Sequence, residues 1–177
     1  MSHEPDRLRR KLLLAGLTFG LVTPVQAREV LRAAAVGLPP DEAAEVHDLL
    51  ATGSLALQTS VVALQRSSNP DVRAFARSEI AEQRGISAAI TGSTRPLPVG
   101  PRNEAVLAEA RSLPGGPASD RVYVRRQIEG HEQLDALARD YADDGSDPHI
   151  VAVARGALPL IRQHLAILQR LDEGLAG

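Results

Sequence analysis

Apolar residues recur at alternating steps of three and four along four segments of the chain, the spacing that places side chains on one face of an α-helix. The pattern predicts long amphipathic helices over residues 41–66, 70–92, 119–142 and 148–175. The last segment has the most regular stripe, made of Ile150, Ala154, Ala157, Ile161, His164, Leu168, Leu171 and Leu175. No segment of the sequence alternates apolar and polar residues as strands do. The sequence therefore predicts an all-α fold.

Residues that favour helix starts and ends divide these segments. Side chains suited to capping precede each helix, and the predicted caps are Asp41, Asn69, Ser119 or Asp120, and Asp147. Two shorter helices are predicted near 29–37 and 103–112. Tight turns join the long helices within each pair, and a longer connection rich in proline and glycine joins the pairs. This order is typical of an antiparallel four-helix bundle.

Composition narrows the range of functions. The chain has 177 residues, a formal net charge of −2 and only 2% aromatic residues. A near-neutral charge without stacking rings does not favour nucleic-acid binding. The absence of cysteine excludes a disulfide framework, a thiolate zinc site and a cysteine nucleophile.

The first 27 residues have the plan of a secretory signal peptide. A basic start at residues 7–11 precedes the apolar run 12–22, and Val25 and Ala27 occupy the −3 and −1 positions of a cleavage site. Eleven apolar residues rise roughly 16 Å as a helix, about half of a bilayer core. We therefore expect residues 1–27 to be a signal peptide and residues 28–177 to form one periplasmic or secreted domain. We expect no stable transmembrane span once the leader is removed.

Polar residues interrupt the apolar stripes of three predicted helices. Glu79 and Gln83 lie on the stripe of 70–92, and His164 lies on that of 148–175. Tyr123, Gln127 and His131 share one face of 119–142, because they are spaced by four residues. We expect all six side chains to point toward the core.

Two interpretations of these residues stay open. In one, His131, His164 and Glu79 bind a single metal ion, for which iron, zinc and copper suit the ligands about equally. In the other, the same residues form a buried hydrogen-bond network with Gln83, Gln127 and Tyr123 that fixes the register of the helices. A di-iron site is not expected, because the chain has no Glu-x-x-His motif.

Three segments resemble a family of exported bacterial proteins known as domain of unknown function 4142, whose members often bear an outer-membrane-protein label. The segments are SSNPDVRAFARSEIAEQ (67–83), SDRVYVRRQIEGHEQLDAL (119–137) and LPLIRQHLAILQRL (158–171). The resemblance implies a ferritin-like four-helix fold and a location outside the cytoplasm. It implies no reaction.

The resemblance also implies inward polar residues on each helix. His131 and His164 match that pattern. Glu82-Gln83 stands where the family has Asp-His, and Ala56 stands where a Glu is expected. Half of the family's polar cluster is therefore replaced in this chain.

Two functions follow as hypotheses. The first is a non-enzymatic exported bundle that binds an envelope component or a protein partner, or has a structural role there. The second is a ferritin-like metal-binding protein with a mononuclear histidine and carboxylate site in the bundle core. No residue is assigned a catalytic role, and no cofactor other than the metal is expected.

Overall fold

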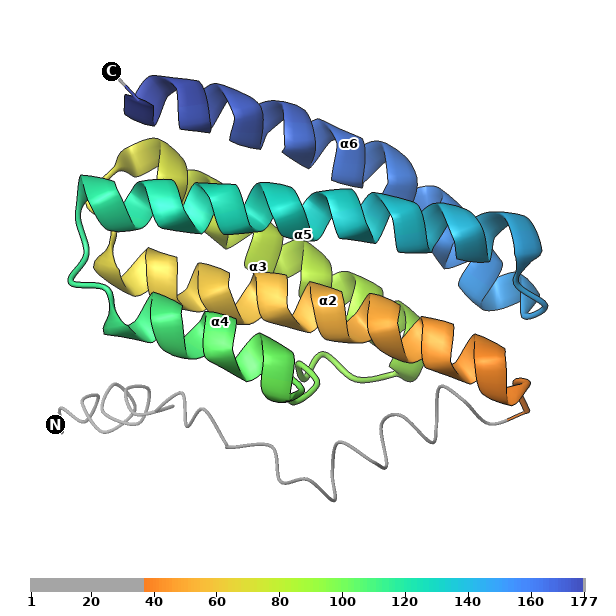
Figure 1. The fold of residues 1–177 in the computed structure, drawn as a ribbon. Helices are drawn as coiled ribbons and strands as arrows, with labels where there is room; N and C mark the ends of the chain where they lie inside the picture. Colours follow the sequence, from red (N-terminus) through yellow and green to blue (C-terminus); the bar gives the residue numbers. More distant parts are fainter. Residues whose placement is uncertain (1–36, 177) are drawn as a thin grey trace, which may run out of the picture.

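The computed structural model describes residues 37–176, and this part of the chain is all-α. Four long helices lie side by side, and a short one runs along the outside of the group (Figure 1). The helices are α2 (Pro40–Arg66), α3 (Pro70–Thr91), α4 (Pro101–Ser112), α5 (Pro117–Asp144) and α6 (Pro148–Ala176). The prediction of an all-α chain is confirmed, and each long helix agrees with its predicted range to within two residues at either end. The expected signal peptide 1–27 and most of the expected helix 29–37 lie outside the described residues.

Two of the predicted helix starts are confirmed. Asn69 Oδ1 accepts hydrogen bonds from the backbone N–H groups of Asp71 and Val72 at the start of α3. Asp147 Oδ1 does the same for His149 and Ile150 at the start of α6. In both cases the capping side chain satisfies amides that have no partner within the helix.

The predicted start of α5 is wrong by two residues. Neither Ser119 nor Asp120 caps this helix, because Gly116 is the N-cap and Pro117 is the first helical residue. Gly116 has a φ of 83°, a backbone conformation that favours glycine. Ser119 Oγ instead accepts a hydrogen bond from the backbone N–H of Gly115 at 3.0 Å. The Gly-Pro sequence therefore decides where α5 begins.

The predicted cap of α2 is wrong for a similar reason. Helix α2 begins at Pro40, and Pro39 occupies the N-cap position without a side-chain hydrogen bond. Asp41 thus lies inside the first turn, where its negative charge still interacts favourably with the helix dipole. A proline in the first helical position has a suitable φ and lacks only an amide that would be unpaired anyway.

The packing of the helices is uneven. Helix α5 packs most extensively on α6, and α2 packs on both α3 and α5. Helix α3 also meets α6, but this contact is the sparsest among the four neighbouring pairs of long helices. The short α4 packs on α2 and, less extensively, on α5. The face between α3 and α6 is therefore the most open side of the group.

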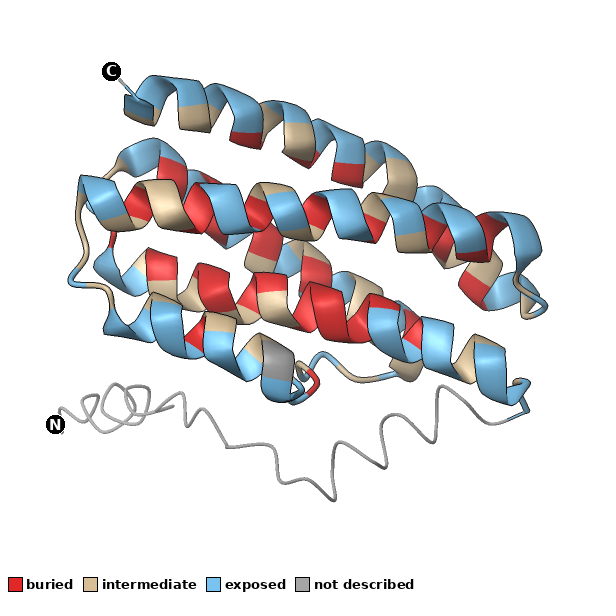
Figure 2. Ribbon diagram, viewed as in Figure 1, coloured by how far each residue is buried: buried red, intermediate tan, exposed pale blue. Residues whose placement is uncertain are grey.

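Buried residues line the inner faces of all four long helices (Figure 2). The apolar part of the core falls into two clusters. One surrounds Leu134, Tyr141 and Ile161, and the other surrounds Phe75 and Leu168. A layer of buried polar residues lies at intermediate positions along the helices and includes Ser60, Glu79, Gln127, His131 and His164. This polar layer brings ionisable side chains from three helices into the core.

Helix α6 is both long and apolar. Within the described residues, it is the one helix whose length and composition would allow it to cross a membrane. Core helices of soluble proteins can have the same length and composition. Helix α6 buries Ile150, Ile161 and Leu168 against the other helices. In the apolar stretch of α6 that meets these criteria, 22% of the residues are buried inside the described part of the protein.

Candidate metal site

Three helices bring Glu79, His131 and His164 together in the centre of the protein. Glu79 comes from α3, His131 from α5 and His164 from α6. Their exposed fractions are 0%, 1% and 4%. We call these three residues the Glu–His–His triad. The positions follow from the helix stripes, since each residue lies on the inner face of its helix.

The facing atoms of the triad form a small triangle. Glu79 Oε2 lies 2.9 Å from His164 Nδ1 and 3.2 Å from His131 Nε2. The two nitrogens are 3.2 Å apart. One carboxylate oxygen and two imidazole nitrogens therefore converge on one point.

The other nitrogen of His131 fixes the state of its ring. His131 Nδ1 lies 2.8 Å from the backbone oxygen of Gln127, one turn earlier on α5. A carbonyl oxygen only accepts hydrogen bonds, so Nδ1 carries the proton. In the neutral ring, Nε2 then presents a lone pair to the centre of the triad. A hydrogen bond of this kind on the outer nitrogen is the usual support of a metal-binding histidine.

His164 has a comparable outer partner. Its Nε2 lies 2.9 Å from Glu82 Oε2, and Ser78 Oγ donates a hydrogen bond of 2.7 Å to Glu82 Oε1. The direction of the His164 contact does not meet hydrogen-bond geometry, so Oε2 of Glu82 accepts no aligned bond from the described residues. The carboxylate nevertheless faces Nε2 and favours the proton there. In that tautomer Nδ1 presents a lone pair to Glu79.

The charges of the triad follow from these contacts. Burial alone would raise the pKa of Glu79, but hydrogen bonds and charge interactions with His131 and His164 outweigh it and lower the pKa from 4.5 to about 2. Burial would lower the pKa of His164, but Glu79 and Glu82 outweigh it and raise the pKa above 6.5. Glu79 is therefore a carboxylate, and the site favours positive charge beside it.

One more atom of the triad lacks a partner. Glu79 Oε1 is buried and accepts no hydrogen bond from any described residue. A buried carboxylate oxygen without a donor is costly. Phe75 lies over both histidines, with ring centroids 5.1 Å from His164 and 6.0 Å from His131. The triad is thus a buried group whose carboxylate has a lone pair without a donor among the described residues.

The remaining polar residues of the predicted network form a separate group. Gln127 Nε2 donates to Thr59 Oγ1 at 2.8 Å and to the backbone oxygen of Ala56 at 3.1 Å. Tyr123 Oη lies 2.8 Å from Ser60 Oγ. We call Thr59, Ser60, Tyr123 and Gln127 the amide–hydroxyl network. Burial raises the pKa of Tyr123 well above 10, a rise that the charge of Glu79 reinforces and the Ser60 hydrogen bond opposes, so this phenol is neutral.

Gln83 belongs to neither group. Its Oε1 packs against the backbone of Gly53 on α2, so closely that a Cβ at Gly53 would lie 2.3 Å from it. No hydrogen bond joins Gln83 to the other buried polar side chains of residues 37–176. The structure therefore leaves Gln83 outside the hydrogen bonds of the predicted network, and the two remaining groups meet where His131 Nδ1 contacts the backbone oxygen of Gln127.

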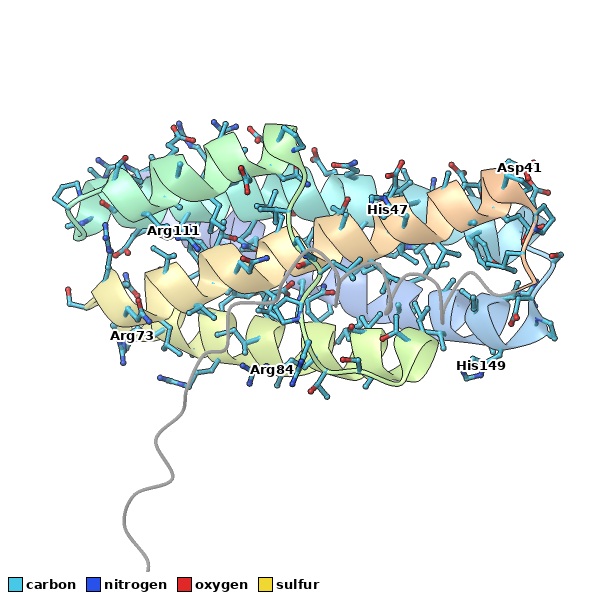
Figure 3. All side chains as sticks on the ribbon, turned by 90° about the horizontal axis from the view of Figure 1, so that it is seen from below. Asp41, His47, Arg73, Arg84, Arg111 and His149 are labelled. Atoms are coloured by element: carbon cyan, nitrogen blue, oxygen red, sulfur yellow. The ribbon has the colours of Figure 1, made fainter. Side chains whose placement is uncertain are left out.

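The other described histidines lie on the surface (Figure 3). His47 contacts Asp48 at 3.2 Å, and His149 Nε2 lies 2.8 Å from the backbone oxygen of Ala89. Neither is near the triad. They provide natural controls for experiments on His131 and His164.

Three residues that matter here were not predicted. Glu82 was noted only as a departure from the family pattern, and Thr59 and Ser60 were not assigned to the polar network. A signal for Glu82 existed, because it lies three residues after Glu79 and four after Ser78, which are the spacings of neighbours on a helix. Its partner on α6 could not be read from that spacing.

Comparisons with known proteins agree with the resemblance described above. Residues 28–171 match the profile of a family described as a domain of unknown function, DUF4142. Because this match covers most of the chain, the protein belongs to that family. The same comparisons gave no match among curated proteins or among solved structures.

Proposed function

We propose that this DUF4142 protein binds one divalent transition-metal ion through Glu79 Oε2, His131 Nε2 and His164 Nδ1. The observation that carries the proposal is the tautomer argument. The outer nitrogen of each histidine faces an acceptor, Gln127 on one side and Glu82 on the other. With neutral rings, two lone pairs and a carboxylate oxygen then face one another within 3.2 Å. A cation between these three atoms would satisfy all of them.

The size of the triangle suits a metal ion. With metal–ligand bonds of about 2.1 Å, adjacent ligands lie about 3.0 Å apart on an octahedron and about 3.4 Å apart on a tetrahedron. The two observed edges of 3.2 Å fall in this range, and the third, at 2.9 Å, lies just below it. Two imidazoles and one carboxylate suit iron(II), zinc and copper(II). Three protein ligands on one side would leave positions open for water or another small ligand.

A structural role is the second candidate, and one observation favours it. A proton shared within the triad would also satisfy the lone pairs, and the low pKa of Glu79 fits a carboxylate beside an imidazolium. In this case the triad would fix the register of α3, α5 and α6 without a ligand. The protein would then act as a non-enzymatic binding or structural component of the envelope.

The wider setting of the site is part of the proposal. We infer an antiparallel four-helix bundle of the ferritin-like type, exported by the leader 1–27 to the periplasm or the exterior. The short connections 67–69 and 145–147 support antiparallel neighbours. Metal sites in such bundles are built from side chains on facing helices, as the triad is. No enzymatic reaction is proposed.

The test is the metal content of the exported protein. The full chain, secreted through its own leader and purified without a chelator or a polyhistidine tag, should contain about one transition-metal ion per chain. His131→Ala and His164→Ala should remove the metal. His149→Ala is the matched control, since this histidine is on α6 but exposed. A metal-free protein that takes up no iron, copper or zinc would favour the structural role instead.

A further inference from the structure

An open groove between α3 and α6 leads to the triad. Its volume is about 480 Å³. Its walls include Asp71 and Glu82 from α3, and His164 and Arg170 from α6. The groove follows the side where α3 and α6 make their sparse contact. At one end it reaches the imidazole of His164.

The triad has little other access to solvent. Glu79 and His131 are fully buried, and His164 alone of the three contributes to the groove wall. Three other hollows of the described chain are lined by other residues and contain no member of the triad. Among these four hollows, the groove between α3 and α6 is therefore the one that borders the triad.

Phe75 stands between the groove and the triad. Its side chain lines the groove and also packs on both histidine rings, edge-on to His164 at 5.1 Å between centroids. Only 4% of Phe75 is exposed. Rotation of this ring would open the inner end of the groove without breaking a hydrogen bond.

We propose that the groove is the route by which a metal ion, and then a small ligand with an oxygen or nitrogen donor, reaches the triad, and that Phe75 is the side chain that moves to admit them. The inference rests on the proposed metal site. The acidic side chains of the wall outnumber its one arginine, Arg170, and this balance favours a cation. Asp71 provides a carboxylate toward the outer end, and Glu82 provides one beside His164. Carboxylates that line a groove raise the local concentration of cations.

The experiment compares rates with equilibrium affinity. Ala74 is an exposed residue on the groove wall, so Ala74→Trp should fill the groove and leave the triad intact. The metal-free full chain would be mixed with zinc, and the loaded protein would be mixed with a strong chelator. The rate of zinc uptake and the rate of zinc release should each fall by at least about tenfold, as expected for a gated path. The dissociation constant for zinc should stay the same.

Two further variants make the test decisive. Ala152→Trp places the same bulky ring at an exposed position of α6 outside the groove wall and should leave both rates unchanged. Phe75→Leu should accelerate both rates, and it keeps the test open if Ala74→Trp does not fold. If Ala74→Trp and Phe75→Leu take up and release zinc at the wild-type rates and with normal affinity, the proposed route is wrong and the metal site still stands. A wild-type protein that binds no zinc, iron or copper would overturn the metal site together with the route.

Discussion

Two groups of buried polar side chains lie one helical turn apart on α5, and they differ in how their hydrogen bonds are satisfied. In the amide–hydroxyl network every side-chain donor has an acceptor: Gln127 donates to Thr59 and Ala56, Thr59 to Leu55, and Ser60 to Ala56. Its one unpartnered atom among the described residues is Gln127 Oε1. The network thus joins α2 to α5 by its own bonds.

The Glu–His–His triad is the opposite case. Its three facing atoms are all acceptors when the histidines are neutral, and Glu79 Oε1 has no partner either. Buried polar groups are normally paired, because an unpaired one costs about 1–3 kcal/mol. The network leaves one buried acceptor without a partner, whereas the facing atoms of the triad need a proton or, as we propose, a metal ion between them. Substitutions in both groups and a pH series can break or sharpen this contrast.

The largest effect is expected for Glu79→Gln. The amide has nearly the same size but no charge, so one of the three ligands is lost. Metal affinity should fall by more than about 100-fold, since even the loss of an outer partner costs 10–100-fold. Competition with a chromophoric chelator measures this. An unchanged affinity would show that the metal, if bound, lies elsewhere.

The next effect concerns the support of His164. Glu82→Gln should weaken metal binding by about 10–100-fold, because Glu82 favours the tautomer in which Nδ1 faces the metal. Glu132→Gln is the control, as Glu132 follows His131 in the chain but is exposed. Equal metal affinities in the two variants would show that Glu82 does not contribute to metal binding.

A pH series distinguishes the stability that the triad gains from its protonation state from the stability that it gains from bound metal. The pKa of Glu79 is lowered to about 2, so its contribution to stability is complete above pH 4.5 and is lost as the pH falls toward 2. The pKa of His164 is raised, so its contribution is complete below pH 6.5 and is lost as the pH rises through the raised value. The metal-free triad is thus most stabilising between these limits.

The metal competes with the proton on the histidines, and its effect should therefore grow from pH 5 to pH 7.5. At a hundredfold excess over Kd, bound metal adds about 2.7 kcal/mol, or roughly 5–10 °C in Tm for a domain of this size. Thermal unfolding with and without zinc measures the difference. The double variant His131→Ala/His164→Ala should show no zinc-dependent shift at any pH.

Variants of the network should change stability and spare metal binding. Tyr123→Phe removes the hydrogen bond to Ser60 and should lower the free energy of unfolding by about 1 kcal/mol. Gln127→Leu should cost no more than about that, because it also removes an unpartnered buried oxygen. A loss of metal affinity in either variant would show that the two groups act as one.

The smallest effect is expected for His149→Ala. The side chain of this exposed histidine has one hydrogen bond, to the backbone oxygen of Ala89. Its loss should change stability by less than about 0.5 kcal/mol and leave metal binding unchanged. A reduced metal content in this variant would indicate adventitious binding by surface histidines.

Sequence periodicity located most of the fold and the triad, and its limits are physical. Each stripe shows which face of a helix is buried, so Glu79, His131 and His164 could be placed inside. The stripe does not show which neighbouring helix a residue meets. Gln83 lies one turn from Glu79 yet faces Gly53 on α2, and no pattern within α3 distinguishes the two directions.

Glu82 was missed for a related reason. Its side chain is half-buried at the edge of α3, and it reaches His164 because α3 and α6 leave a groove between them. That groove depends on how two distant segments pack. The start of α5 was missed because Gly116-Pro117 outweighs the capping side chains that follow it.

The most direct test is a titration of the metal-free full chain with zinc, iron(II) and copper(II) in competition with a chromophoric chelator. The account predicts saturation at one ion per chain for the wild-type protein. It also predicts loss of that binding in Glu79→Gln, His131→Ala and His164→Ala, with Tyr123→Phe and His149→Ala unaffected. Binding that is absent from the wild-type protein, or that survives all three triad substitutions, would contradict it.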